Sequence, residues 1–361
     1  MQPHGYFHYV AYQSFLRVFS PICTSVHGTL GNVTIRDNDA HLAATMYYLQ
    51  DETMETIARH LGISRSSVSR LLAYAREVGL VRITVAEDPG ARGTLAGEIN
   101  RIFGIRTTVV RVRDYDTGVS HLSNVARVAA ERFLDIVRPG NVIGIAWGNT
   151  TAEVTRHISP IGISDTTVVQ LNGAASAHGT GVRYIDTTIS QAAEALGAEM
   201  VHFPVPAFFD YEDTKNALWR ERSVRSVLDL ISRADIAMFG VGAFEGDVPS
   251  HVYSGGYLDE QEIERVRADG VVGDICTVLI REDGSYADMP INRRASGPTP
   301  DVLRQIPRRL CVVAGEAKAI PLIGALRAGV ITDLVVDDRA ARRVLERLRM
   351  TGMRKRAAVS R

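Results

Sequence analysis

The sequence predicts an α/β protein with two folded parts, a small N-terminal winged helix-turn-helix unit and a large Rossmann-like domain on a mostly parallel sheet. Between residues 38 and 79, apolar residues recur at helical spacing around a short glycine-containing turn. Farther along, apolar strand-like runs alternate with helical patterns. The 361 residues, 45% of them hydrophobic, are enough for two separate cores. We expect an N-terminal extension (1–35), the helix-turn-helix unit (36–87), a linker (88–94), the large domain (95–350) and a basic tail (351–361).

Composition argues against several classes of protein. Basic and acidic residues are equal in number, 41 of each, so attraction to nucleic acid requires a local basic patch. The three cysteines, Cys23, Cys276 and Cys311, have neither disulfide-framework nor zinc spacing, and the histidines show no metal-ligand pattern. No apolar run reaches the roughly 20 residues of a membrane span. We therefore expect a protein of the reducing cytoplasm, without metal or membrane. Residues 1–35 are interpreted as a poorly ordered extension, with an interaction arm as the alternative.

Three short helices are predicted in the N-terminal unit. The first is capped by Asp39, and its apolar face is formed by Leu42, Met46 and Leu49. The second spans residues 54–61 and stops at Gly62, which can adopt the left-handed conformation of a helix end. The third spans residues 65–78 after the N-cap Ser64. Residues 80–85 then alternate as a strand, in the position of a wing.

The outer face of the third helix is predicted to contact double-stranded DNA. Five polar residues lie on this face, namely Arg65, Ser66, Ser67, Ser69 and Arg70. The serines are short enough to approach base edges, and the arginines can bind phosphates. Residues 53–83 contain five arginines and two acidic residues, so a local basic patch exists within a neutral chain. The alternative is an ordinary three-helix bundle whose arginines and serines face water.

The large domain is predicted to alternate strands and helices. Strands are expected at residues 107–112, 142–146, 167–171, 200–203, 236–241, 275–280, 310–313 and 334–336. Helices are expected at residues 95–103, 125–137, 187–196, 224–233, 320–328 and 339–349. Because ligands of open parallel sheets bind beyond the carboxyl ends of the strands, the loops that follow the strands are the place to look for a site.

Two polar loops follow neighbouring predicted strands. After strand 142–146, a helix start carries Gly148, Asn149, Thr150 and Thr151. A glycine allows close backbone approach, hydroxyls donate hydrogen bonds, and a helix N-terminus is partly positive, so this loop suits a phosphate. The alternative is an N-capped helix with structural threonines. After strand 167–171 come Asn172 and Gly173, whose alternative is a plain turn.

Two charged residues near later strands complete the candidate site. Lys318 is one of three lysines in a chain with 38 arginines, and it follows strand 310–313, where it can reach a phosphate. Its alternative is a solvated lysine at a helix start. Asp274 can contact sugar hydroxyls or act as an acid/base, and its alternative is a capping or loop carboxylate. The loop at Gly240 lacks the spacing and the acid of a dinucleotide fingerprint, so no cofactor is expected.

Together these motifs resemble the SorC family of bacterial regulators across residues 40–350. The resemblance is carried by residues 55–72 (ETIARHLGISRSSVSRLL), 142–150 (VIGIAWGNT), 168–173 (VVQLNG) and 312–320 (VVAGEAKAI). It implies a winged-helix DNA reader joined to an effector domain similar to glucosamine-6-phosphate deaminase and ribose-5-phosphate isomerase, commonly acting as a tetramer on carbohydrate operons. The family's phosphate loop falls on residues 148–151 and its lysine on Lys318. Ala174 departs from the family, because many relatives have a second glycine there.

These observations predict a transcriptional regulator of a carbohydrate operon, expected by analogy to repress it. The N-terminal unit would bind operator DNA, and the large domain would bind a phosphorylated sugar or polyol as effector. Self-association as a homodimer or homotetramer is expected. The alternative is a sugar-phosphate isomerase or deaminase on the same fold, with Asp274 as its acid/base, for which the sequence offers no clear second catalytic group.

Overall fold

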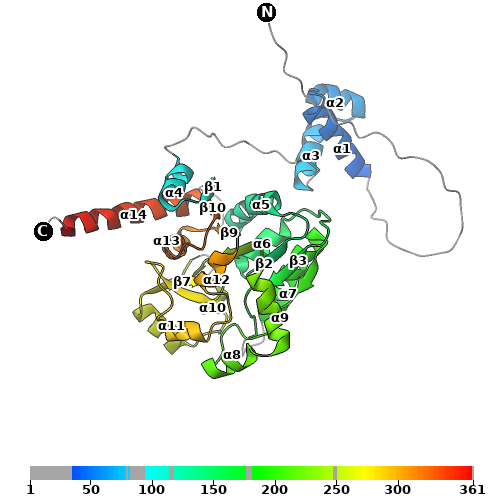
Figure 1. Cartoon of the computed structure of the whole chain (residues 1–361). Helices are drawn as coiled ribbons and strands as arrows, with labels where there is room; N and C mark the ends of the chain where they lie inside the picture. The colour runs from blue at the N-terminus through cyan, green and yellow to red at the C-terminus, as the bar shows by residue number, and fades with distance from the viewer. Residues whose placement is uncertain are drawn as a thin grey trace, which may run out of the picture. The chain divides into compact units, whose positions relative to one another are not determined.

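The protein is seen here in a computed structural model, which describes residues 35–78, 80–81, 94–113, 118–175, 181–246 and 250–359. The chain divides into two compact units, one within Met1–Ala86 and one within Glu87–Arg361 (Figure 1). Three expected segments lie almost entirely outside the described residues. These are the N-terminal extension, the wing and the linker, of which only residues 35, 80–81 and 94 are described.

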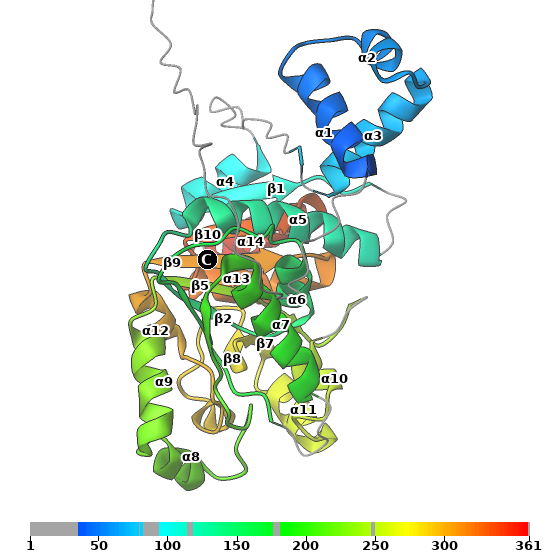
Figure 2. The same ribbon diagram turned by 90° about the vertical axis from the view of Figure 1, so that its right-hand side faces the viewer.

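The described part of the N-terminal unit is a bundle of three helices, α1 (Ile35–Tyr48), α2 (Met54–Leu61) and α3 (Arg65–Glu77), drawn in blue in Figures 1 and 2. Its core holds Ile57 and Val68, neither of which is exposed to solvent. α2 ends at Gly62 with φ of 66°, a left-handed conformation that costs glycine little. α3 begins after Ser64, whose side chain accepts the backbone N–H of Ser67 at 3.1 Å. The predicted helix-turn-helix is therefore confirmed.

The first helix differs from its prediction in two ways. α1 begins at Ile35, so Asp39 lies inside the helix and does not cap it. The expected apolar face is correct only for Met46, which is buried, because Leu42 is 40% exposed and Leu49 is 80% exposed. The residues that α1 buries are Ala40, Ala43, Ala44 and Met46. α1 packs along α3, and small alanines let the two backbones approach closely, so this face is buried in place of the leucines.

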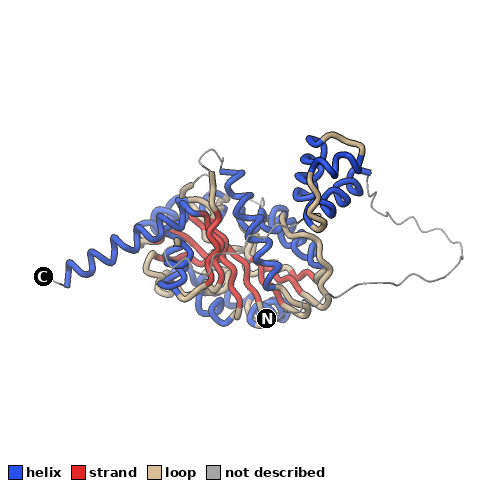
Figure 3. The backbone as a smooth tube through the Cα atoms, turned by 90° about the horizontal axis from the view of Figure 1, so that it is seen from above, coloured by secondary structure: helices blue, strands red, loops and turns tan. Residues whose placement is uncertain are grey.

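The large unit is built on a seven-stranded parallel sheet with the strand order β1-β10-β9-β5-β2-β3-β4. The strands are β1 (Arg106–Val110), β2 (Val142–Ile145), β3 (Thr167–Gln170), β4 (Glu199–Val201), β5 (Ile236–Gly240), β9 (Arg308–Val313) and β10 (Asp333–Asp337). Figure 3 shows the strands side by side, with helices on both faces. Parallel strands need crossover connections, which the helices supply, so the predicted alternation and α/β class are confirmed.

Two hydrophobic cores lie on the two faces of the sheet. One core packs α5 (Gly118–Ile136), α6 (Asn149–Arg156) and α7 (Gly181–Leu196) against the strands. The other contains residues of α4 (Leu95–Phe103), α9 (Arg222–Ser232), α12 (Pro300–Gln305), α13 (Ala319–Arg327) and α14 (Asp338–Val359). Adjacent strand residues face opposite cores, as Val168 and Val169 of β3 do. Both faces are covered, which explains why the strands read as continuous apolar runs in the sequence.

A second, three-stranded sheet corrects the prediction of a single strand at residues 275–280. The chain instead forms an antiparallel hairpin of β7 (Val271–Ile275) and β8 (Val278–Arg281), next to β6 (Gly242–Ala243). Cys276 and Thr277 form the turn, with φ of 49° and 71°. These left-handed positions usually hold Gly or Asn, so the run Ile-Cys-Thr-Val carries no turn signal. Short helices α8 (Glu212–Leu218), α10 (His251–Ser254) and α11 (Glu260–Ala268) complete this unit.

Three further observations concern the expected tail, the membrane and the cysteines. α14 continues to Val359 and so includes most of the segment expected as a separate basic tail (Figure 1). Among the described helices, none is long and apolar enough to cross a bilayer. Cys276 and Cys311 are both buried and carry free thiols.

Candidate functional site

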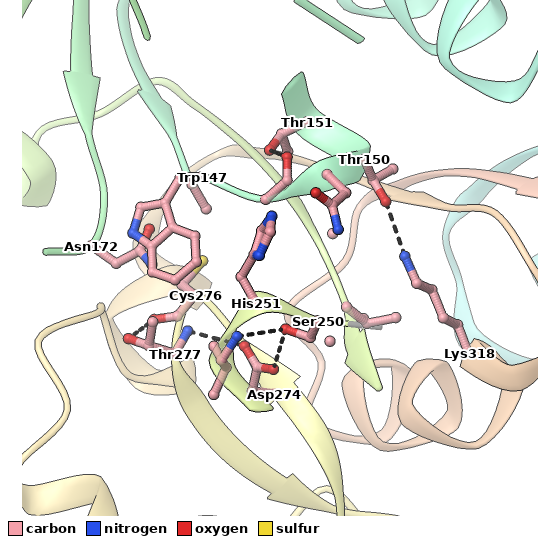
Figure 4. Close-up of a pocket in the computed structure, with 17 residues that line it drawn as sticks. Trp147, Thr150, Thr151, Asn172, Ser250, His251, Asp274, Cys276, Thr277 and Lys318 are labelled. Atoms are coloured by element: carbon pink, nitrogen blue, oxygen red, sulfur yellow. Dashed lines mark hydrogen bonds between the residues drawn. The ribbon is translucent and has the colours of Figure 1, made fainter. Parts of the chain in front are cut away.

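A pocket of about 500 Å³, here called the central pocket, opens at the carboxyl ends of the parallel strands. From β2 the chain adds β3 and β4 on one side, and β5, β9 and β10 follow on the other. The pocket therefore lies where the strand order reverses, the usual binding crevice of open α/β sheets. The structure brings together most of the residues predicted for the effector site, namely Gly148, Asn149, Thr150, Thr151, Asn172, Asp274 and Lys318 (Figure 4).

The loop after β2 forms one wall of the central pocket. Gly148 precedes α6, and Asn149 begins it, so the backbone N–H groups of the first turn lie at the pocket. Thr150 and Thr151 are 4% and 1% exposed, and Thr151 Oγ1 donates to the Gly148 carbonyl at 3.0 Å. The wall therefore presents hydroxyls and a partly positive helix end to the pocket.

Lys318 joins this wall from the loop after β9. Its Nζ donates to Thr150 Oγ1 at 3.0 Å, although the two residues are 168 positions apart in the chain (Figure 4). Gly315 holds the loop in place by donating its N–H to Asp337 Oδ2 at 2.7 Å. Burial lowers the pKa of the Lys318 ammonium, while the carboxylates of Asp274 and Asp337 oppose this effect. A positive group is thus placed beside the N-terminus of α6.

Asp274 reaches the pocket from the second sheet, on β7. Its side chain is buried, and Ser250 Oγ and the backbone N–H of Thr277 donate to it at 3.4 and 3.2 Å. Burial raises the pKa of Asp274 to about 6, although these donors, the Tyr253 hydroxyl and the charge of Lys318 favour the carboxylate. The carboxyl group can therefore accept hydrogen bonds from a ligand, and it binds a proton more readily than an exposed aspartate.

Asn172 and Gly173 both follow β3, but only Asn172 lines the central pocket. Asn172 lines the pocket, and its side-chain Oδ1 is buried with no hydrogen bond to any described residue. Such an acceptor is costly to bury unless a ligand or water completes it. Gly173 does not line the pocket. Its carbonyl accepts the Trp147 indole N–H at 2.8 Å, and a Cβ at this position would lie 2.4 Å from the carbonyl oxygen of Val205.

Several residues that the sequence did not single out also line the central pocket, namely Trp147, Ser250, His251, Cys276 and Thr277. The Trp147 ring stacks on Tyr257 with centroids 5.3 Å apart. Burial lowers the pKa of His251. No motif marks His251 in the sequence, and Cys276 and Thr277 lay inside the wrongly predicted strand. Aromatic Trp147, next to the predicted phosphate loop, is the one signal that could have been used.

The expected DNA face of α3 is largely open to solvent. Arg65, Ser66, Ser69 and Arg70 are exposed, whereas Ser67 is half-buried. Ser67 Oγ lies 2.9 Å from Ser64 Oγ and accepts a hydrogen bond from Arg70 at 3.2 Å. Ser67 therefore ties the helix cap to Arg70, while the other four side chains remain accessible.

The polar groups of the central pocket lie at two ends. Thr150 and Lys318 lie at one end, and Asn172 lies at the opposite end beside Trp147 (Figure 4). Groups of three or more His, Cys, Asp and Glu residues that could hold a metal are absent from the described part of the chain. The pocket thus offers donors and a positive charge at one end and hydrogen-bond acceptors elsewhere.

Comparison with known proteins assigns both units. The Sugar-bind family of sugar-binding domains matches residues 92–346, and the sigma-70 region 4 family matches residues 45–78. The chain is 31% identical to the deoxyribonucleoside regulator of Bacillus subtilis (strain 168) over 309 residues, which cover 85% of this chain and 96% of that protein. It is 27% identical to the sorbitol operon regulator of Klebsiella pneumoniae over 306 residues, which cover 84% and 96%.

Solved structures agree with these matches. The full-length sorbitol operon regulator SorC from Klebsiella pneumoniae has a TM-score of 0.69 and 26% identity, over 85% of this chain and 97% of that one. A domain of a possible sugar-binding transcriptional regulator from Arthrobacter aurescens TC1 has a TM-score of 0.66 and 42% identity, over 72% and 99%. These relatives are named as regulators, which confirms the resemblance predicted from the motifs. The chain belongs to the SorC family of sugar-binding, DNA-binding transcriptional regulators.

Proposed function

We propose that the central pocket binds a phosphorylated sugar or polyol, and that this effector controls binding of operator DNA by the helix-turn-helix unit. The observation that carries the proposal is the hydrogen bond from Lys318 Nζ to Thr150 Oγ1 at the start of α6. It places an ammonium group beside backbone N–H groups and two buried hydroxyls, a combination that favours a phosphate over a neutral group.

The remaining polar groups of the pocket suit the hydroxyls of a sugar. Asp274 is an acceptor when ionised, and Asn172 Oδ1 is a buried acceptor without a partner among the described residues. A polyol chain carries hydroxyl donors that can satisfy both groups. We assign the phosphate to residues 148–151 and Lys318, and the hydroxyls to Asn172 and Asp274. Gly173 contributes by holding Trp147 against the pocket wall.

We further propose that α3 contacts the operator through Arg65, Ser66, Ser69 and Arg70, with Ser67 positioning Arg70. Effector binding would change operator affinity by a coupling free energy between the two sites. Repression that the effector relieves is the mode we assign, by analogy with regulators of sugar operons. The protein would act in the cytoplasm as a homodimer or homotetramer, because paired reading helices match the two halves of a palindromic operator.

The effector assignment is tested with matched pairs of phosphorylated and unphosphorylated sugars. Bound ligand raises the unfolding temperature by mass action, so a thermal-shift panel of such pairs shows which sugars bind. Lys318→Met should lower affinity for the phosphorylated member about tenfold or more, since a charge-assisted hydrogen bond is lost. Affinity for the unphosphorylated member should change little.

The control for this experiment is Lys215→Met, which removes a lysine on α8 that does not line the central pocket. An equal loss of affinity for both members of a pair would remove the phosphate assignment. Operator binding is measured on the same proteins at fixed salt concentration, because phosphate contacts make DNA affinity strongly salt-dependent. An effector that binds tightly but leaves operator affinity unchanged would contradict the proposed regulation.

A further inference from the structure

A second cavity, here called the side pocket, adjoins the central pocket. It has a volume of about 860 Å³, part of which is open to solvent, and it lies beside the carboxyl ends of β9 and β10, near the first turns of α5 and α14. Thr150 and Lys318 line both cavities, and their hydrogen bond of 3.0 Å forms part of the wall between them. One ammonium group is therefore within reach of ligands on either side.

Basic groups line the inner part of the side pocket. Lys318 is joined there by His121 from α5 and Arg339 from the first turn of α14. His121 is 8% exposed, and its Nε2 is buried without a hydrogen bond to any residue in the described ranges. The carboxylate atom Asp337 Oδ2 lies 3.4 Å from this nitrogen. This nitrogen therefore has a carboxylate nearby but no well-aligned hydrogen-bond partner among the described residues, and a ligand in the pocket can supply one.

The acidic residues of the side pocket are engaged elsewhere. Glu245 and Glu316 have side chains that are 80% and 60% exposed, and they pair with Arg267 and Arg343 at 3.2 and 3.9 Å. Asp337 lies behind the pocket and does not line it, and its oxygens accept the backbone N–H groups of Gly315 and Ala340. Among the described lining residues, Lys318 and Arg339 are the cationic side chains and Glu245 and Glu316 are exposed, while the Asp337 carboxylate is buried behind His121.

We propose that the side pocket is a second anion site, which takes the phosphate or carboxylate group of a small metabolite and is coupled to the central pocket through Lys318. The coupling rests on the proposed function, because it requires Lys318 to serve the effector phosphate as well. Lys318 offers one positive charge to two neighbouring anions, so occupation of one pocket changes the affinity of the other. The second anionic group belongs either to the far end of a longer effector or to a separate ion.

The test is titration of the full-length protein with inorganic phosphate, followed by calorimetry. Three variants distinguish binding in the two pockets. Thr151 lines the central pocket alone, Arg339 lines the side pocket alone and Lys318 lines both. Wild type should bind two phosphates per chain. Thr151→Val and Arg339→Gln should each weaken a different one about tenfold or more, and Lys318→Met should weaken both.

Arg342→Gln is the matched control, since Arg342 lies on the same helix, pairs with Asp338 and lines neither pocket. If Arg339→Gln binds two phosphates with the affinities of wild type and Arg342→Gln, the second site is refuted. If Thr151→Val has no effect while Arg339→Gln removes one phosphate, the proposed effector site fails and the side pocket remains. Arg339→Lys should restore part of the affinity, because it keeps the charge and loses the forked donors.

Two sugar phosphates distinguish the sources of the second anion. Glucose 1,6-bisphosphate and glucose 6-phosphate are each added to protein that is saturated with inorganic phosphate. Displacement of both phosphates by one equivalent of the bisphosphate would assign the side pocket to the far end of the effector. If the phosphate whose binding requires Arg339 stays bound in the presence of either sugar, the side pocket would be assigned to a separate anion.

Discussion

Replacing Asp274 by asparagine should stabilise the large unit at neutral pH and remove part of its pH dependence. Asp274 is buried, and its pKa is raised from the ordinary value of 3.8 to about 6. An acid with a higher pKa in the folded than in the unfolded chain binds its proton more tightly when folded. Its contribution to stability is therefore complete below pH 3.8 and is lost as the pH rises to about 6. Asparagine resembles the protonated acid in shape and keeps an oxygen to accept the Thr277 N–H.

The size of the effect follows from the shift in pKa. A change from 3.8 to about 6, at roughly 1.4 kcal/mol per unit, corresponds to about 3 kcal/mol of stability lost by wild type above pH 6. At pH 4.5 roughly a third of this cost is already present. The advantage of Asp274→Asn over wild type should therefore grow by about 2 kcal/mol between pH 4.5 and pH 7.5.

Tryptophan fluorescence during urea unfolding is the assay, because both tryptophans, Trp147 and Trp219, belong to the large unit. Asp213→Asn on α8, where the side chain is exposed, is the control and should show no such growth. A stability difference between Asp274→Asn and wild type that is the same at pH 4.5 and pH 7.5 would refute the reasoning. We also expect the variant to bind the effector more weakly, because a charged acceptor in the central pocket is lost.

Three other substitutions test the remaining parts of the molecule. Arg65→Ala should weaken operator binding by about 1–3 kcal/mol and leave the stabilisation by the effector as in wild type. DNA binding equal to that of wild type in a mobility-shift assay would contradict the assignment of α3 as the DNA-contacting helix. Gly173→Ala should destabilise the large unit by about 1–3 kcal/mol, because its Cβ would lie 2.4 Å from the carbonyl oxygens of Val205 and Pro206. Urea unfolding that matches wild type would disprove this close contact. Gly62→Ala should destabilise the N-terminal unit by about 1–2 kcal/mol, because φ is 66° at this residue. Equal hydrogen-exchange protection of α2 in variant and wild type would contradict the predicted destabilisation.

Local sequence patterns determined most helices of the N-terminal unit and the parallel strands of the large unit. Gly62 and Ser64 mark the end of one helix and the start of the next, since each acts on backbone groups within a few residues. The parallel strands were visible as short apolar runs, because a strand covered on both faces needs no polar alternation. The loop at 148–151 and Lys318 could also be placed, because the carboxyl ends of parallel strands meet at one edge of a sheet.

Tertiary structure decided which of these elements meet and which side chains they present. Lys318 reaches Thr150 only because β9 and β2 flank β5 in the sheet, an order that strand patterns do not encode. Asp274 enters the pocket on a hairpin whose turn residues, Cys276 and Thr277, adopt left-handed conformations, and the Cys276 carbonyl packs closely against Gly297, which lies far away in the sequence. Likewise, α1 buries its alanines because α3 lies close to it. Periodicity and turn signals report interactions within a few residues, whereas a pocket depends on contacts between residues that lie far apart in the chain.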